Sequence, residues 1–243
     1  MAAKQQWAFQ PRFRAKAYGW RGSKLAVERL REAVSEIQKA GRTDALLAAD
    51  GAVLLFTRLW PALQQIDGSS GVLGSAVHWT QEELLPLVTA APADRKTRKR
   101  WLERLWAAIE EDGVDYLAPV QDRWGELCGS AELASLWADR LVEVVRGALS
   151  GRVLSEPDSV GYSSATSVCL SSLLAAGRHE EIFELLGLER FPFWHYRKFG
   201  VAALEKEGRL EEALQFAEAS RGLNQPDRLI SEVCARLRGR VAG

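Results

Sequence analysis

The sequence predicts an all-α fold in which helical hairpins stack into an α-solenoid, and three observations support this prediction. Residues 175–182 (AAGRHEEI) recur as residues 206–213 (KEGRLEEA), and each copy lies between two apolar helical runs. Apolar residues elsewhere recur with the period of a helix, and no segment shows the alternation typical of strands. A helix–turn–helix unit that occurs twice cannot bury its apolar face alone, so such units stack.

The N-terminal helical-repeat part covers residues 23–149. Ser23 is placed to cap its first helix, and Gly41 ends that helix. Thr80 with Glu83 matches a capping box and predicts a helix that begins there. Pro61 bends or divides the second helical stretch. The expected helices cover residues 23–40, 43–66, 80–90, 92–112, 114–128 and 130–148.

Residues 150–164 are predicted to form a loop or hinge, because the stretch around them is rich in Gly and Ser and contains Pro157. The repeat part follows over residues 165–243. Gly239-Arg240 follows the Gly208-Arg209 pair at the repeat spacing, so the last repeat is expected to be incomplete. An open apolar end predicts a homodimer through the C-terminal end. The expected helices cover residues 162–176, 178–187, 192–207, 209–221 and 226–238.

Composition narrows the class of protein. The 243 residues are 47% apolar, and 32 basic residues balance 32 acidic ones. The three Cys are scattered, which argues against a disulfide framework and for a reducing compartment. No signal peptide or membrane span is evident, so we expect a cytoplasmic protein that has no contact with a membrane. Without a phosphate loop, a dinucleotide fingerprint, a GxSxG or an HExxH motif, we expect no enzyme activity, cofactor or metal.

The C-terminal repeat carries a resemblance to a known family. The Gly-Arg-x-Glu-Glu-Ala turn at residues 208–213 resembles a tetratricopeptide repeat. This resemblance implies that Ala203 and Ala213 face each other where two helices cross. Arg197 and Val201 stand where that family has Trp and Gly.

A second resemblance covers most of the chain. It is to a family of uncharacterised bacterial helical-repeat proteins, and it implies a helical-repeat fold but no catalytic residues. The strings that carry it are YGWR at 18–21, WLERLW at 101–106, WGELC at 124–128, FWHYR at 193–197 and EASRGL at 218–223.

The N-terminal arm, residues 1–22, is a candidate binding element. Residues 1–31 hold eight basic residues and one acidic residue, with five aromatic rings interleaved. This composition suits a nucleic acid or an acidic protein, and it equally suits an arm whose rings dock on the protein's own helices. The candidate nucleic-acid-binding residues of this region are Arg12, Arg14, Lys16, Arg21 and Lys24.

A second basic cluster opens the helix that follows Pro92. Cations there oppose the helix dipole, while Glu110, Glu111 and Asp112 crowd the other end. A bound polyanion would explain the arrangement, and so would pairing with acidic residues of adjacent helices. The cluster consists of Arg95, Lys96, Arg98, Lys99 and Arg100.

The segment 191–199 contains five aromatic residues. Either its rings pack in the core, or part of the segment lines a concave surface that binds a protein partner. The candidate partner-binding residues are Phe193, Trp194, Tyr196 and Arg197. The sequence thus favours a non-enzymatic scaffold or adaptor for a protein partner. The alternative is a nucleic-acid-associated subunit of a larger complex that uses the arm and the cluster at 95–104.

Overall fold

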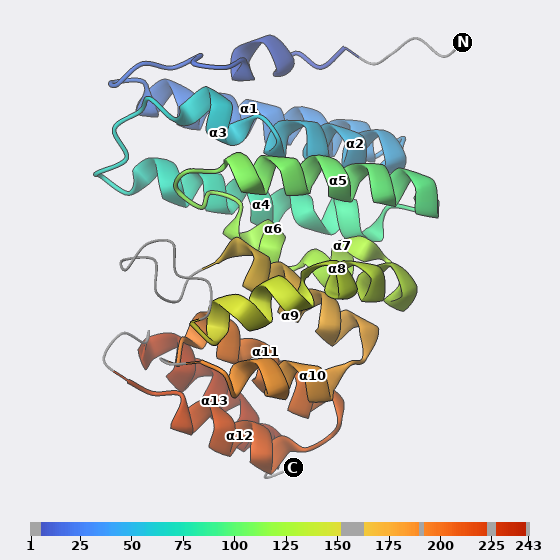
Figure 1. Cartoon of the computed structure of the whole chain (residues 1–243). Coiled ribbons are helices and arrows are strands. Elements are labelled where there is room, and N and C mark those ends of the chain that lie inside the picture. Colours follow the sequence, from blue (N-terminus) through green and yellow to red (C-terminus); the bar gives the residue numbers. More distant parts are fainter. Residues whose placement is uncertain (1–5, 152–162, 190–191, 223–226, 242–243) are drawn as a thin grey trace. The chain divides into compact units, whose positions relative to one another are not determined.

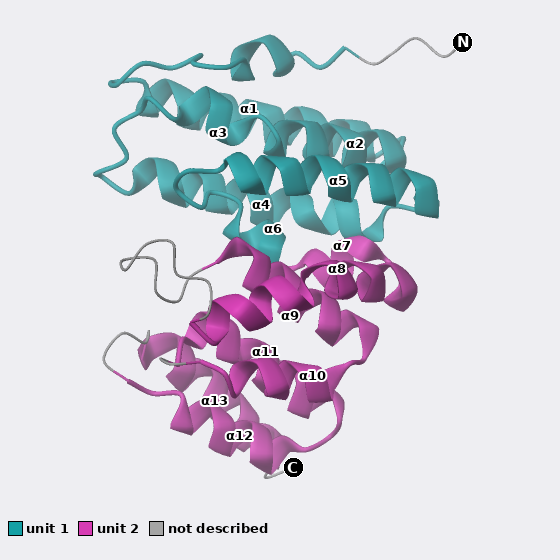
Figure 2. Ribbon diagram, viewed as in Figure 1, with its two compact units in different colours: residues 1–121 teal, residues 122–243 magenta. Residues whose placement is uncertain are grey.

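The computed structural model describes residues 6–151, 163–189, 192–222 and 227–241, and every regular element in these ranges is helical (Figure 1). The prediction of an all-α protein is therefore confirmed for this part of the chain. Two compact units are present, residues 1–121 and residues 122–243 (Figure 2). The predicted loop at 150–164 falls within the second unit, and most of it lies outside the described residues, as does Lys4 of the arm.

Unit 1 is a set of packed helices preceded by the arm. α1 packs against α2 and α4, and α2 also packs against α4 and α5. Its interior is apolar, with Leu30, Leu55 and Leu84 fully buried. The elements are η1 (Gln10–Phe13), α1 (Ser23–Gly41), α2 (Ala45–Phe56), α3 (Leu59–Leu63), α4 (Val72–Ala90), α5 (Arg95–Glu111) and α6 (Ala118–Asp122), whose last residue belongs to unit 2.

The start of α4 differs from the prediction. The helix begins at Val72, after Gly71 in the left-handed conformation (φ 71°), and not at the expected capping box. Thr80 is fully buried inside the helix, where its hydroxyl donates to the carbonyl oxygen of Ala76 at 2.8 Å. A Thr hydroxyl inside a helix can donate its hydrogen bond to the carbonyl oxygen four residues earlier. The capping pattern alone therefore did not locate the helix start.

Unit 2 contains seven helices among its described residues, besides the last residue of α6. α7 and α8 both pack on α9, and each later helix packs on the one before it. Ala203 and Ala213, which the tetratricopeptide resemblance expects at a helix crossing, are both fully buried. The helices are α7 (Trp124–Cys128), α8 (Ala131–Leu149), α9 (Ser164–Ala176), α10 (His179–Leu186), α11 (Trp194–Lys206), α12 (Leu210–Ala219) and α13 (Asp227–Val241).

The two copies of the sequence repeat have the same local structure. Gly177 and Gly208 end α9 and α11 with φ of 74° and 75°, a conformation that favours glycine. Arg178 and Arg209 follow and precede α10 and α12 with nearly identical backbone angles. Each Arg makes a two-pronged pair with the Glu three residues later, at 2.6 and 2.7 Å in both copies. The repeated turn is thus a conformational unit held by a glycine and an ion pair.

The third Gly-Arg pair does not form such a turn. α13 continues through Gly239 to Val241, beyond the end expected at residue 238. Arg240 and Arg236 both pair with Glu205, a largely buried carboxylate on α11. These pairs connect the last described helix to the preceding hairpin.

Replacing Gly125 by Ala should destabilise unit 2. A Cβ at this position would stand 2.5 Å from the Cβ of Ala175 and closer still to the carbonyl oxygen of Ser171. We expect overpacking to lower the free energy of unfolding by about 1–3 kcal/mol, measured by urea denaturation. The matched control is Gly239→Ala on α13, where the added methyl meets no atom within 4 Å. An equal effect of both substitutions would contradict the packing.

The contribution of Glu205 to the stability of the fold should disappear at low pH. Hydrogen bonding from Arg236 lowers the pKa of Glu205, and the charges of Arg236 and Arg240 add to this effect. A carboxylate whose pKa is lower in the folded state stabilises the fold above its unfolded pKa of about 4.3, and this stability is lost as the pH falls through the folded pKa. Glu205→Gln should therefore lower unfolding free energy at pH 7 and have little effect near pH 2. A pH-independent difference in denaturant titrations would exclude the ion pair as the cause.

Candidate binding surfaces of unit 1

The aromatic rings of the arm dock on unit 1. The side chains of Trp7, Phe9, Phe13 and Tyr18 are all buried. The ring of Trp7 lies so close to Gly51 of α2 that a Cβ there would stand 2.5 Å from it. Four of the five rings are therefore covered by the protein's own helices, and cannot stack on the bases of a nucleic acid in this conformation.

Polar contacts also hold the arm. The amide of Lys16 donates to the carbonyl oxygen of Pro61 at 2.7 Å, and the carboxylate of Glu36 accepts the amides of Ala8 and Phe9. The guanidinium of Arg58 reaches the carbonyl oxygens of Gln10 and Phe13. Backbone groups of the arm are thus satisfied by α1 and by the α2–α3 region, which fixes the direction in which its charges point.

The basic side chains of the arm remain at the surface. Arg12 pairs with Glu32 of α1, so its charge is partly neutralised. The other four predicted residues are exposed, and so is Trp20, with 68% of its surface accessible. The structure therefore brings one open ring and a group of cations to this part of unit 1. The four exposed cations are Arg14, Lys16, Arg21 and Lys24.

The cluster at the start of α5 divides into exposed and buried members. The carboxylate of Asp94 caps the helix by accepting the amide of Thr97 at 2.7 Å, and a carboxylate at this end also offsets the cations. Arg100 lies 3.7 Å from Asp50 of α2, an exposed pair of little energetic weight. The exposed members are Arg95, Lys96, Lys99 and Arg100.

Arg98 has a structural role, which corrects its assignment as a nucleic-acid-binding residue. Its guanidinium donates to the carbonyl oxygens of Val88, Thr89 and Ala91, the last at 2.6 Å. These carbonyls lie at or just after the end of α4, where helix geometry leaves acceptors without partners and the dipole is negative. A buried cation is stable there because the end of α4 supplies its acceptors, and it is not available to phosphate.

The aromatic segment of unit 2 lies largely in the interior. Trp194 is buried, and Tyr196 has no exposed surface; its hydroxyl accepts the amide of Ser163 at 2.8 Å. Arg197 pairs with Glu189 at 3.1 Å, and Phe193 is half-buried. A ring with no exposed surface cannot touch a partner in this conformation. Trp194 and Tyr196, predicted as partner-binding residues, therefore act in packing.

A groove between α1 and the start of α4, the α1–α4 groove, was not anticipated from the sequence. Its volume is about 500 Å³. Two large apolar side chains remain open there, Val72 with 55% and Trp79 with 38% of their surface exposed. Arg31 supplies the one formal charge of the lining. The lining residues are Val27, Arg31, Ser70, Gly71, Val72, Ser75, Ala76 and Trp79.

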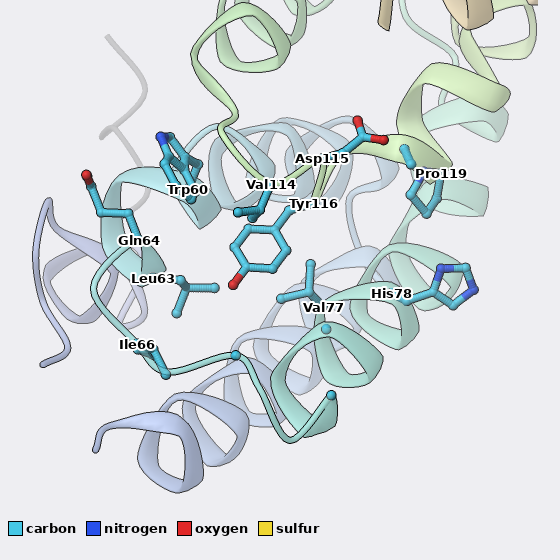
Figure 3. A pocket seen from close by; sticks show the side chains of 14 residues that line it. Trp60, Leu63, Gln64, Ile66, Val77, His78, Val114, Asp115, Tyr116 and Pro119 are labelled. Atoms are coloured by element: carbon cyan, nitrogen blue, oxygen red, sulfur yellow. The ribbon is translucent and has the colours of Figure 1, made fainter. Parts of the chain in front are cut away.

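A second cavity of about 540 Å³, the Tyr116 cavity, lies between α3, α4 and the segment 114–119. Figure 3 shows Tyr116 in the middle, with Trp60 and Leu63 on one side and Val77 on the other, and the His78 ring directed away. The lining consists of Trp60, Leu63, Gln64, Ile66, Gly68, Gly71, Gly74, Val77, His78, Val114, Asp115, Tyr116, Ala118 and Pro119.

The loop after α5 is held by its own carboxylate. Asp112 accepts the amides of Val114 and Leu117 at 3.3 and 2.9 Å. Burial raises the pKa of Asp112, although these hydrogen bonds act in the opposite direction. The amide nitrogen of the Gln81 side chain donates to the carbonyl oxygen of Tyr116 at 2.7 Å. These hydrogen bonds therefore fix the position of the Tyr116 backbone.

A histidine-centred cluster of unit 2 does not have the geometry of a nucleophilic triad. Nε2 of His195 lies 2.8 Å from the hydroxyl of Ser167 and 3.8 Å from the carboxylate of Asp122. A triad uses the two ring nitrogens separately, one for the nucleophile and one for the carboxylate. Here both groups approach the same nitrogen, and Lys198 pairs with the carboxylate. This arrangement does not support acyl transfer.

Neither a metal-binding cluster nor a membrane-spanning helix occurs in the described part of the chain. No group of three or more His, Cys, Asp or Glu side chains within it could hold a metal ion. No helix within it combines the length and the apolar content that crossing a bilayer requires. Comparison with family models, with curated proteins and with solved structures gives no match to this chain.

Loss of Arg98 should destabilise unit 1. Arg98→Gln shortens the side chain and removes the charged donor, so the carbonyls at the end of α4 lose their partners. We expect the free energy of unfolding to fall by about 1.5–3 kcal/mol in urea denaturation. Lys99→Gln removes the same charge from the neighbouring exposed position and should change it by less than about 0.5 kcal/mol. Similar losses for both variants would show that Arg98 contributes only its charge.

Proposed function

We propose that this protein is a non-enzymatic scaffold or adaptor of the α-solenoid type that binds a protein partner through the α1–α4 groove. The observation that carries the proposal is the presence of Val72 and Trp79, two open apolar side chains, in one groove. Exposed apolar patches bordered by polar residues mark interaction sites, and Trp is a frequent energetic anchor of protein interfaces. The proposed surface replaces the segment 193–197, because Trp194 and Tyr196 are buried.

The solenoid part of the proposal rests on the repeat. The turns at 177–178 and 208–209 share their backbone angles and their ion pairs, and each helix from α9 to α13 packs on its predecessor. Stacked hairpins of this kind present extended surfaces that serve in binding. The resemblance to tetratricopeptide repeats points to the same class of function.

Charge favours a partner segment that carries acidic residues beside its apolar ones. Arg31 lines the groove, and residues 6–31 contain seven basic residues and one acidic residue. The backbone oxygen of Trp20 accepts the amide of Asp67, so the basic arm ends next to the turn that leads into the groove. Complementary charge speeds encounter and selects partners, while the apolar anchors supply affinity.

A nucleic-acid-associated function is the second candidate. The observation that favours it is the open ring of Trp20 among Arg14, Lys16, Arg21 and Lys24. Single-strand binding surfaces combine cations with aromatic rings on which bases stack, and the arm exposes one such ring. It ranks second because the other four rings of the arm are buried.

The substitution Trp79→Ala should abolish binding of the protein partner. The full chain, immobilised, would be used to capture proteins from a lysate of the source organism at physiological salt. We expect a protein retained by the wild type and at least tenfold depleted by Trp79→Ala, because this ring is the largest anchor of the groove. Val144→Ser, an exposed apolar position of unit 2, is the matched control and should retain it. Capture that is identical for all three proteins would refute the proposed surface.

Binding to a labelled oligothymidylate should separate the two candidates. If the groove binds a protein, fluorescence anisotropy should show only weak binding that falls steeply with added salt, as for any basic surface. Saturable binding at 150 mM salt that is lost in Trp20→Ala, but kept in Trp79→Ala, would favour the nucleic-acid function instead.

A further inference from the structure

The lining residues of the α1–α4 groove follow a regular spacing along α4. They occupy positions i, i+3, i+4 and i+7, so they lie on one face and cover two turns of the helix. In coiled-coil packing, four residues of one helix form the hole that receives a side chain of the facing helix, and this spacing describes such a hole. On α4 a large apolar residue stands at each end of the hole, with two small residues between them. The four residues are Val72, Ser75, Ala76 and Trp79.

α1 forms the second wall of the groove. The amide of Asp67, which precedes α4, donates to the carbonyl oxygen of Trp20, which precedes α1. Farther along both helices, the side-chain amide of Gln38 donates to the carboxylate of Glu83 at 2.8 Å. α1 and α4 therefore run in the same direction, and the groove follows both of them. The residues of α1 that line it are Val27 and Arg31.

The structure that fits these walls is another helix. Except at their ends, the N–H and C=O groups of α1 and α4 are bonded within the helices. An extended segment would therefore find few backbone partners in the groove and would leave its own polar groups unpaired. A helix bonds its own backbone and presents apolar side chains to a groove at positions i, i+3, i+4 and i+7. One of these side chains would enter the hole between Val72 and Trp79.

The charge beside the hole is positive. Arg31 is exposed, is the one lining residue with a formal charge, and makes no ion pair with another described residue. The acidic residues beside it on α1 are Glu28, which is outside the lining, and Glu32, which forms ion pairs of its own. On α4, Glu82 and Glu83 lie beyond the last lining residue, and the first turn contains no acidic residue to offset the positive end of the dipole. An acidic residue of the partner complements this charge.

We infer that the α1–α4 groove binds an amphipathic helix of a protein partner, with a large apolar side chain in the hole on α4 and an acidic residue beside Arg31. The inference rests on the proposed function, because it specifies the kind of segment that the proposed partner places in the groove. It also predicts that the shape of the hole, and not only its apolar character, determines binding.

The test uses a synthetic peptide of about 18 residues, stapled on its polar face so that it is helical. Leu occupies positions i, i+4, i+7 and i+11, Glu flanks the Leu face, and Ala fills the rest. One control peptide has the same composition in an order that scatters the Leu residues around the helix, and another has Lys in place of Glu. In fluorescence anisotropy with the full chain, we expect saturable binding of the acidic helix. Binding should be at least tenfold weaker for the scattered peptide and roughly threefold weaker for the Lys peptide.

Filling the hole separates shape from apolar character. Ser75→Leu makes the groove more apolar but occupies the space of the incoming side chain, so it should weaken binding of the acidic helix at least tenfold. His78→Leu is the matched control, because it adds the same side chain at an exposed position of α4 outside the groove lining, and it should have at most a twofold effect. Thermal unfolding that matches the wild type would show that both variants are folded.

Reversing the charge tests the acidic residue. Arg31→Glu should reverse the preference, so that the Lys peptide binds more tightly than the Glu peptide. An unchanged preference for Glu would contradict the acidic partner.

Two results would overturn the helix in the groove. One is full affinity of Ser75→Leu for the acidic helix, and the other is no saturable binding of that helix to the folded wild type. If Trp79→Ala still loses a partner from lysate in either case, the proposed function stands and only the helical segment is refuted. The two failures are therefore distinguishable.

Discussion

Burial of the arm's aromatic rings is the constraint on which the surface of unit 1 depends. Trp7, Phe9, Phe13 and Tyr18 enter the interior, and the backbone between them bonds to α1 and the α2–α3 region. Without this burial the cations of residues 12–24 would belong to a free basic tail. With it, they are held at fixed positions beside the turn that opens the α1–α4 groove. The same segment thus serves as part of the core and as a charged border.

Several charged residues that suggest a binding function in the sequence instead stabilise the ends of helices. Arg98 satisfies the carbonyls at the end of α4, while Arg178 and Arg209 form ion pairs across the start of α10 and α12. The first and last turns of a helix leave backbone groups without partners, and a charged side chain supplies them or offsets the dipole. The charged side chains that have no such structural role are the ones that inform on function. In unit 1 they include Arg14, Lys16, Arg21 and Lys24 of the arm, which are exposed.

Periodicity and glycine predicted most helices and the repeated turn, because they act within one or two turns of chain. Two of the predicted caps did not form, because Ser23 and Thr80 lie inside α1 and α4. The helix expected at 130–148 is α8, and Ser130 caps it by accepting the amide of Leu133. Features that depend on contacts distant in sequence were not predictable. The buried Tyr196, for example, accepts through its hydroxyl the amide of Ser163, 33 positions earlier in the chain. Both cavities likewise form where separate segments meet, so no local motif marked them.

Amide hydrogen exchange of the arm tests the central claim most directly. The amide of Lys16 donates to Pro61, and those of Arg12 and Phe13 donate to Phe9. If the rings are docked, these amides should exchange far more slowly than in a free peptide and approach the protection of α1, since they open only when the arm leaves unit 1. Exchange of all three at free-peptide rates, while α1 stays protected, would contradict the docked arm and with it the fixed basic border of the groove.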